Sequence, residues 1–485
     1  MHRKLSCLGL GLAVLICGCG SEDDTFVSGF NLFATGLRIS AQPTAGTPNT
    51  VLSNLQVQFV NNNQVVPTQG GVSLSLSTNP TNAVLGGTTS GTTNSNGQID
   101  FTNLTISKRG VYRITASAAG VPSVVSNPIV VGGGAVNANK IASIANAGAT
   151  LGGIFSVHSA DLNGDGNLDL VSSFFDDNLI AVYLGNGSGG FAAPINRTVA
   201  GAGPQDFTIA DFDSDGKADL AIPASLLNTV LFFKGVGDGT FNAPVSVNVG
   251  TNPVDAAVGD FNGDGRPDLA VANFNSNNIT ILLNNNSFAF TASTLNLATG
   301  TDRPAGLVVT DINGDGRADL AVADFQNDKM EFYLGNGNGT FGAVNSLASG
   351  VSPRDVVAGD LNGDGRADLV TANRDTNNLS VFLNNGAGSF AAAANLASGV
   401  NPNKVAMVDL NLDGKLDLIN TNSNGGNASI FLGNGDGTFG APTAQATSTA
   451  QPTGLDVGDY NKDSIPDFAI GNFSPFVLHI FQQTP

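Results

Sequence analysis

A nine-residue acidic segment recurs seven times in the second part of this 485-residue chain and constrains its fold more than any other feature. The pattern is Asp-x-Asn/Asp-x-Asp, then Gly in six of the seven copies, then two variable residues and a final Asp. Successive copies begin 50, 49, 51, 49, 49 and 50 residues apart. A period this regular predicts a repeat architecture with one copy in each structural unit. The copies are residues 161–169, 211–219, 260–268, 311–319, 360–368, 409–417 and 459–467.

Strand patterns surround each acidic segment. A short apolar run precedes it, as at 356–358, a second run follows it at 369–372, and a third follows a polar turn at 379–383. Most repeats then show a Gly-rich turn that ends in Phe, and a weak fourth strand. Four short strands in about 50 residues make one blade of a β-propeller, and seven repeats lie within the usual range of roughly four to eight blades. We therefore predict an all-β fold in which residues 140–485 form a seven-bladed β-propeller.

The two ends of this region predict how the ring closes. Residues 476–481 have the pattern of a third strand, so the last repeat lacks a fourth. Residues 140–145, which precede the first repeat, have the character of that missing strand. Pairing of these two segments would close the ring and remove an open sheet edge.

The acidic segments have the ligand chemistry of calcium sites. Ca²⁺ takes roughly six to eight oxygen ligands, which positions 1, 3, 5 and 9 of a tight loop can supply, together with the carbonyl at position 7. Gly at position 6 allows the positive φ that reverses the chain. EF-hand loops begin in the same way, but position 12 here is not Glu, and strands flank the loop. The alternative is a loop that only caps a strand end, which seven copies in register disfavour.

One Ca²⁺ is expected in each loop, up to seven in all, and these ions are expected to stabilise the blades. The seventh loop departs from the pattern, because Ser464 stands in the Gly position. The predicted metal ligands are Asp161, Asn163, Asp165 and Asp169; Asp211, Asp213, Asp215 and Asp219; Asp260, Asn262, Asp264 and Asp268; Asp311, Asn313, Asp315 and Asp319; Asp360, Asn362, Asp364 and Asp368; Asp409, Asn411, Asp413 and Asp417; Asp459, Asn461, Asp463 and Asp467.

The seven loops, with Phe439-Gly440-Ala441-Pro442 after a third strand, resemble the FG-GAP (VCBS) repeats of integrin α-subunit propellers. The resemblance covers about residues 140–485, although residues 286–288 depart from it where the Gly-rich turn is expected. It implies a calcium-binding propeller that meets its partners through the loops of one face. Fungal lectins with similar repeats bind sugars between blades, so the resemblance also admits a carbohydrate ligand.

The loops between second and third strands belong to the rim opposite the acidic loops. They place aromatic rings beside amides and charged groups, a combination that suits sugars or peptides. The alternative is that the rings fill the blade cores and the polar neighbours only form turns. The predicted ligand contacts are Phe174, Phe175, Phe274, Phe325, Arg374 and Phe473.

Residues 1–18 resemble a bacterial lipoprotein signal peptide. A basic start precedes an apolar run, and Ile16-Cys17-Gly18-Cys19 resembles a lipobox in which Cys19 receives the lipid. Ordinary signal-peptidase cleavage is the alternative. Residues 19–33 are predicted to be a tether, and Gly20 after the cysteine is typical of sorting to the outer membrane and the cell surface.

Residues 34–132 show period-2 strand patterns at 55–60, 72–76, 99–101 and 110–114. The segment resembles the bacterial Ig-like domains of surface proteins, which implies a β-sandwich that acts as a spacer. Residues 133–139 are predicted to link it to the propeller.

Together these features predict a monomeric, calcium-binding surface lipoprotein that acts in adhesion or binds an extracellular protein. Carbohydrate binding and a structural or assembly role are the alternatives. The net charge of −19 argues against a nucleic-acid partner and against membrane contact beyond the lipid anchor. An enzyme is disfavoured, because the predicted mature chain has only His158 and His479 as histidines and shows no nucleophile motif.

Overall fold

The computed structural model describes residues 34–61, 63–67, 70–133, 135–136, 138–145, 152–297, 302–447, 451–474 and 476–483. All the regular elements in these ranges are β-strands, so the all-β prediction is confirmed. Within the same ranges, no helix has the length and apolar character needed to cross a membrane. The predicted signal peptide, Cys19 and the tether lie outside the described residues.

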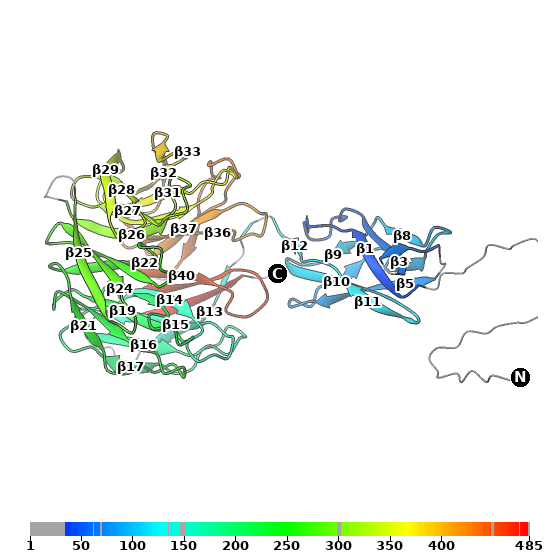
Figure 1. Cartoon of the computed structure of the whole chain (residues 1–485), viewed down its shortest axis with the longest axis horizontal. Helices are drawn as coiled ribbons and strands as arrows, with labels where there is room; N and C mark the ends of the chain where they lie inside the picture. The colour runs from blue at the N-terminus through cyan, green and yellow to red at the C-terminus, as the bar shows by residue number, and fades with distance from the viewer. Residues whose placement is uncertain are drawn as a thin grey trace, which may run out of the picture.

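Residues 34–133 form a body with two main sheets around one core (Figure 1). Val57 from one sheet and Ile114 from the other are fully buried in that core, which is the arrangement of a β-sandwich. All four strand patterns predicted here are present, as β3, β5, β8 and β10. The strands are β1 (Gly36–Ala41), β2 (Ala45–Gly46), β3 (Leu55–Asn61), β4 (Gln64–Val65), β5 (Gly71–Thr78), β6 (Leu85–Gly86), β7 (Ser90–Thr92), β8 (Gln98–Phe101), β9 (Thr105–Ile106), β10 (Gly110–Ala118), β11 (Val121–Val125) and β12 (Ile129–Val131).

From residue 138 onward, the described residues contain seven four-stranded antiparallel sheets, one for each repeat. A short hairpin, β33 (Asn384–Gly386) and β34 (Ser389–Phe390), extends the fifth. The sheets are β14 (Ile154–Ala160), β15 (Asp169–Phe174), β16 (Leu179–Tyr183) and β17 (Ile195–Thr198); β18 (Thr208–Ala210), β19 (Asp219–Ala224), β20 (Thr229–Phe233) and β21 (Val245–Asn248); β22 (Pro253–Gly259), β23 (Asp268–Asn273), β24 (Asn278–Asn284) and β25 (Phe290–Asn296); β26 (Pro304–Thr310), β27 (Asp319–Asp324), β28 (Lys329–Gly335) and β29 (Phe341–Ala348); β30 (Pro353–Gly359), β31 (Asp368–Asn373), β32 (Asn378–Phe382) and β35 (Ala394–Ala397); β36 (Pro402–Val408), β37 (Asp417–Asn422), β38 (Asn427–Phe431) and β39 (Thr443–Ala446); β40 (Pro452–Gly458), β41 (Asp467–Asn472), β42 (Val477–Gln483) and β13 (Ala138–Ala145).

Burial within each sheet explains the sequence pattern. In the third repeat all six residues of β23 are buried, whereas most of β25 is exposed. Second strands are covered on both faces by the neighbouring sheets, so after the initial Asp they consist mainly of apolar or small residues and show no alternation of buried and exposed positions. Each fully buried Val or Leu side chain contributes about 1.5–3 kcal/mol relative to an exposed one. Packing between sheets therefore holds the repeats together.

The first strands of the seven sheets form a circuit. β14 contacts β18, the contacts continue through β22, β26, β30 and β36 to β40, and β40 contacts β14. The predicted closure is confirmed, because β13 pairs antiparallel with β42 from Ala138↔Gln483 to Ala145↔Val477. Repeated four-stranded antiparallel sheets of this kind fit a β-propeller.

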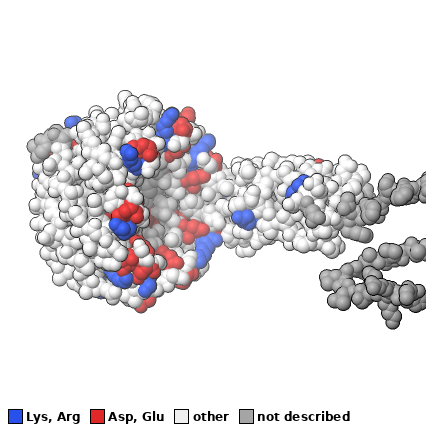
Figure 2. Space-filling view, in the orientation of Figure 1, with Lys and Arg blue, Asp and Glu red and all other residues white. Residues whose placement is uncertain are grey.

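The N-terminal body contacts the larger body at its acidic-loop rim (Figure 1). The N–H of Gly133 donates to the carbonyl of Asn411 at 2.6 Å, inside the sixth acidic loop. Arg109, which is buried, interacts electrostatically with Asp463 of the seventh loop. In Figure 2 the charged side chains of the larger body gather mainly on the side nearer the N-terminal body.

Candidate functional site

The first aspartate of each acidic loop folds that loop. In the third loop, Asp260 Oδ1 accepts the N–H of Gly263 at 2.7 Å, and its Oδ2 accepts the N–H of Gly265 at 2.8 Å. Gly265 has a φ of +79°, in the left-handed region that favours glycine. Asn262 and Asp264 meet in the same turn, where Asn262 Nδ2 donates to Asp264 Oδ2 at 2.8 Å. The loop thus gathers the oxygen-bearing side chains of positions 1, 3 and 5.

The seventh loop keeps this geometry despite its departure in sequence. Ser464 adopts a φ of +66°, and its N–H donates to Asp459 Oδ2 at 2.8 Å, as the glycine does elsewhere. Asp463 is 8% exposed, unlike the fifth residues of the other six loops, which are all exposed. Its burial comes with the contact to the N-terminal body.

The second loop offers the clearest fit to a cation. One carboxylate oxygen from each of Asp211, Asp213 and Asp215 lies within 4.8 Å of the others, and Asp219 is not part of this group. Asp213 Oδ1 is buried and has no hydrogen-bond partner. Three hard anionic donors around one point, one of them unsatisfied, match the ligands that Ca²⁺ takes. Acidic groups that could hold a metal ion are therefore present.

A lysine shares this second loop. Lys234 Nζ contacts Asp213, and it lies 3.0 Å from Asp215 Oδ2. These two carboxylates raise the pKa of Lys234. The corresponding position is Leu in five of the other repeats and Gln in the seventh. The second loop, which has four acidic residues where the others have three, thus carries its own compensating cation.

The ninth position of every loop has a role that the sequence analysis missed. In each repeat this aspartate is fully buried, and its two oxygens accept one N–H from position 2 of the loop and one from the end of the third strand. Asp319, for example, accepts from Ile312 at 2.9 Å and from Gly335 at 2.6 Å. The aspartate thereby ties the loop to a strand 16 residues further along the chain. The seven residues are Asp169, Asp219, Asp268, Asp319, Asp368, Asp417 and Asp467.

Burial controls the ionisation of these ninth residues. Desolvation raises the pKa of Asp219 and Asp417 to about 6, and that of Asp467 to about 8, against the opposing effect of the two N–H donors. A bound cation would favour the charged form. Whether the ninth residue also binds metal stays a prediction.

A second acidic group lies outside the repeated loops. Asp302, Asp324 and Glu331 are fully buried in the fourth repeat and could also hold a metal ion. Donors already serve these carboxyls: Asn327 donates to both aspartates, and Tyr333 donates to Glu331 at 2.9 Å. Burial raises the pKa of Asp324 and of Glu331.

The structure separates the six predicted ligand contacts. Phe174, the last residue of β15, is fully buried in a sheet core, so its prediction as a ligand contact is wrong. Phe175, Phe274 and Phe325 are half-buried. Phe473 is also half-buried, and Arg374 is exposed. The Phe274 and Phe325 rings lie 5.7 Å apart and come from adjacent repeats.

A cavity of about 160 Å³ opens on the same rim, near the axis around which the first strands are arranged. Six of the seven repeats supply its wall, because the residues at the start of their first strands converge there. Only Phe274 among them was predicted from the sequence, since the others form no motif. The lining residues are Phe155, Gln205, Asp206, Asn252, Val254, Phe274, Ala305, Arg354, Asn403 and Lys404.

A charged network closes the floor of this axial cavity. Lys404 Nζ reaches across the axis to Asp206 and lies 3.3 Å from Asp355 Oδ1. Asp206 Oδ1 also accepts from Ser156 at 2.6 Å and lies 2.8 Å from His158 Nε2. Burial lowers the pKa of His158, but Asp206 outweighs it, so the net shift is upward. The network links the first, second, fifth and sixth repeats.

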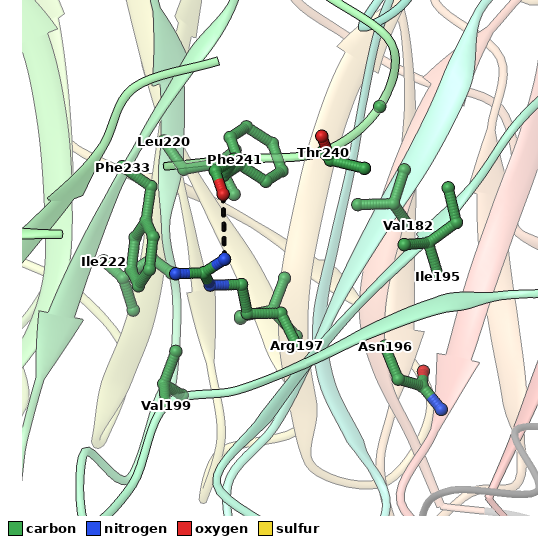
Figure 3. Close-up of a pocket in the computed structure, with 12 residues that line it drawn as sticks. Val182, Ile195, Asn196, Arg197, Val199, Leu220, Ile222, Phe233, Thr240 and Phe241 are labelled. Atoms are coloured by element: carbon green, nitrogen blue, oxygen red, sulfur yellow. Dashed lines mark hydrogen bonds between the residues drawn. The ribbon is translucent and has the colours of Figure 1, made fainter. Parts of the chain in front are cut away.

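A different cavity, of about 130 Å³, lies between the sheets of the first two repeats (Figure 3). Its wall is mainly apolar, with Val182, Ile195 and Ile222 around it. Arg197 crosses its edge, stacks on Phe233 at 5.2 Å and donates to the carbonyl of Phe241 at 2.8 Å. Arg197 is therefore already engaged in contacts within the protein.

The family model for the FG-GAP-like repeat matches residues 161–222, 224–271, 260–322, 311–371, 360–420 and 409–470. These six matches cover more than half of the chain and include all seven acidic loops. The chain belongs to the FG-GAP-like repeat family. Among curated proteins, no relative matches this FG-GAP repeat protein.

Solved structures of BBS1N show the same fold. The FG-GAP repeat protein is similar to BBS1N in a crystal structure with ARL6DN, at 15% identity and a TM-score of 0.51, over 72% of this chain and 97% of that chain. It also matches an Agrocybe aegerita lectin described as recognising non-reducing terminal N-acetylglucosamine, at 19% identity and a TM-score of 0.44, over 75% and 95% of the two chains. At such identities the likeness concerns the fold alone.

Proposed function

We propose that this FG-GAP repeat protein is a calcium-stabilised, seven-bladed propeller that acts as an adhesion or ligand-binding module on the bacterial cell surface. The observation that carries the proposal is the contrast between two rims. One bears seven near-identical acidic loops, and the other bears side chains that differ from repeat to repeat. A repeated rim supports stability, whereas a varied concave rim supports recognition of a ligand. No catalytic role is proposed.

Calcium is the cation that fits the loops best. The loops offer carboxylate and amide oxygens, which are hard metal ligands. One buried oxygen of Asp213 has no hydrogen-bond partner, as expected of an oxygen that binds a cation. In each loop the residues at positions 1, 3 and 5 would hold the ion. Bound calcium would neutralise carboxylates that otherwise repel one another and would stiffen the link between first and second strands.

The N-terminal segments would present the propeller to the outside. We propose that Cys19 carries a lipid anchored in the outer membrane and that the Ig-like sandwich is a spacer. The sandwich contacts the acidic-loop rim, and none of its described residues lines the axial cavity on the other rim. This arrangement supports a propeller whose binding rim stays accessible beyond the anchor.

Carbohydrate binding is the second candidate, and the axial cavity favours it. Amides from Gln205, Asn252 and Asn403 stand beside the rings of Phe155 and Phe274. Amides satisfy sugar hydroxyls, and aromatic rings cover the C–H faces of sugar rings.

The deciding experiment uses the mature chain with calcium and with chelator. Calcium is counted by elemental analysis and titration calorimetry, with up to seven ions expected. Binding is then tested on a glycan array and by capture from a surface-protein extract. If no binding is detected in either assay, the proposed recognition role is wrong and a structural role is favoured. If the protein binds no divalent ions, the proposed role of calcium is wrong.

A further inference from the structure

Four side chains form a row beside the mouth of the axial cavity. The Arg303 guanidinium lies 5.3 Å from the Phe274 ring centroid, and the Arg354 guanidinium lies 5.6 Å from that of Phe325. The two rings are 5.7 Å apart, so the row runs Arg303, Phe274, Phe325, Arg354. Three successive repeats contribute to it. A guanidinium held on an aromatic face is positioned while its N–H groups remain available to a ligand.

Phe274 and Arg354 are the members of this row that line the cavity, and Arg354 is the charged one. Its guanidinium makes no hydrogen bond or ion pair with another described residue, and its side chain is partly buried. Asp355 and Asp375 attract this guanidinium electrostatically but form no ion pair with it. An arginine that is fixed in place and keeps its N–H groups unused is suited to a planar oxyanion, which it can bind through two parallel hydrogen bonds.

The remaining charges of the cavity are paired inside the protein. Lys404 is held by Asp206 and Asp355, and Asp206 also accepts from Ser156. Lys404 offsets the charge of Asp206, and Asp355, which shares Lys404, does not line the cavity. Arg354 remains as the charged group of the wall that can serve a ligand.

The uncharged residues of the cavity indicate which kind of molecule carries the anionic group. The side-chain amides of Gln205 and Asn252 make no hydrogen bond within the described residues, and both line the cavity. The rings of Phe155 and Phe274 lie in the same wall. A cavity of about 160 Å³ has room for one ring-sized group and not for an extended chain. Free amides beside ring faces match a sugar ring, whereas an acidic peptide side chain has no hydroxyls for those amides.

We propose that the axial cavity binds one carboxylate-bearing sugar residue, of the uronic-acid type, at the end of an acidic glycan. Arg354 binds the carboxylate through its guanidinium, Gln205 and Asn252 hydrogen-bond with ring hydroxyls, and Phe155 or Phe274 covers the apolar face of the sugar. The binding is noncovalent, so no bond is made or broken. This inference rests on the proposed ligand-binding function and names the ligand class for it.

The test is titration calorimetry of the calcium-loaded chain with three probes at matched length. These are a short oligomer of galacturonic acid, the neutral galactose oligomer and a glutamate hexapeptide. We expect the uronic-acid oligomer to bind and the neutral oligomer to bind at least about tenfold more weakly, because it lacks the charge-assisted contact. Equal binding of the two sugars, or tighter binding of the peptide, overturns the proposal.

Variants locate the site. Arg354→Gln should weaken binding of the uronic-acid oligomer roughly 10- to 100-fold, and Arg354→Lys should weaken it less, because the charge remains but the planar fork is lost. Arg197→Gln is the matched control, since Arg197 also stacks on a Phe but borders the other cavity. Its affinity should stay at the wild-type value. The reverse result, with Arg197→Gln weak and Arg354→Gln unchanged, overturns the proposal.

Controls distinguish a failure of this inference from a folding defect and from a failure of the proposed function. Each variant is first shown to keep the melting temperature and calcium content of the parent, and Asn252→Ala serves as a second test if Arg354→Gln is unstable. A protein that binds other ligands on the array or in the extract, but not the uronic-acid oligomer, refutes this inference alone. A protein that binds nothing refutes the proposed function as well.

Discussion

The two rims of the larger body differ in how their residues are arranged from repeat to repeat. On the acidic-loop rim the same residue types recur at the same positions, and the same hydrogen bonds recur with them, as between Asp319 and Gly335 or between Asp417 and Gly433. On the opposite rim, equivalent first-strand positions hold Asp206, Asp355 and Lys404, which bind one another across the axis. Repetition makes each repeat stable by the same means, and variation makes one rim a single asymmetric surface.

Removal of calcium should produce the largest effect, because it acts on all seven loops at once. A ligand at 1,000 times its dissociation constant stabilises the folded state by about 4 kcal/mol for each site. We expect the midpoint of thermal unfolding to fall by at least about 10 °C in chelator. Circular dichroism in calcium and in excess chelator measures it. Equal midpoints would contradict the stabilising role of the acidic-loop rim.

Within one loop, the ninth and fifth positions should respond differently to metal. Asp319→Ala leaves the buried N–H groups of Ile312 and Gly335 without an acceptor, which costs about 1–3 kcal/mol for each. This loss should appear with and without calcium. Asp315→Ala removes an exposed metal ligand, so its effect should be larger with calcium than in chelator, where only the hydrogen bonds from Asn313 and Arg317 are lost.

Urea unfolding of both variants in the two conditions provides the measurement. Asp319→Asn is the control, because the amide keeps one acceptor oxygen and should lose less stability than the alanine variant. If the two alanine variants respond to calcium in the same way, the ninth residue acts mainly as a metal ligand, and the structural role given to it here is wrong.

The contrast between positions also shows what sequence alone can predict. Period, strand order and ring closure follow from local patterns, so the pairing of residues 140–145 with the last strand could be predicted. The role of Asp319 could not, because its second N–H donor becomes visible only when the third strand is placed. Phe174 and Phe175 are the same residue type in adjacent positions, and only the backbone decides which ring enters the core.

The axial cavity was hidden for a related reason. Arg354 and Lys404 occupy equivalent neighbourhoods in two repeats, 50 residues apart, and neither belongs to a motif. Their relation to Asp206 depends on closure of the whole ring, which brings the sixth repeat opposite the second. Residues that recur at a fixed spacing can be recognised in a sequence, whereas residues that meet only once in the folded ring cannot.

The two rims should also differ in their response to pH. His158 beside Asp206 has a raised pKa, so it contributes stability that is present below its unfolded value near 6.5 and lost as pH rises through the folded pKa. The acidic loops should behave in the opposite way, since protonation of their carboxylates at low pH would release bound calcium.

A pH series of melting curves in chelator isolates the histidine, because calcium no longer contributes. We expect the parent to lose stability relative to His158→Gln as pH rises from 6 to 8, by roughly 1 kcal/mol or less, because the His158 side chain is 36% exposed. A parent that gains stability relative to the variant over this interval would contradict the assigned charge of the network.

The smallest expected effect concerns Lys234, where the acidic-loop rim departs from its own rule. Lys234→Leu gives the second repeat the residue that the first, third, fourth, fifth and sixth carry. Without calcium the variant should be less stable, because Asp213 and Asp215 lose the ammonium that contacts both. With calcium it should match the parent, and the second site should bind the ion up to about fivefold more tightly, because no lysine competes for the carboxylates. Calcium titration of parent and variant measures this difference as a change in the affinity of one site, while the other sites keep the affinities of the parent. If the second site binds calcium less tightly in the Leu variant, Lys234 does not compete with the ion. Lys234 would then help to hold the loop in its calcium-binding conformation.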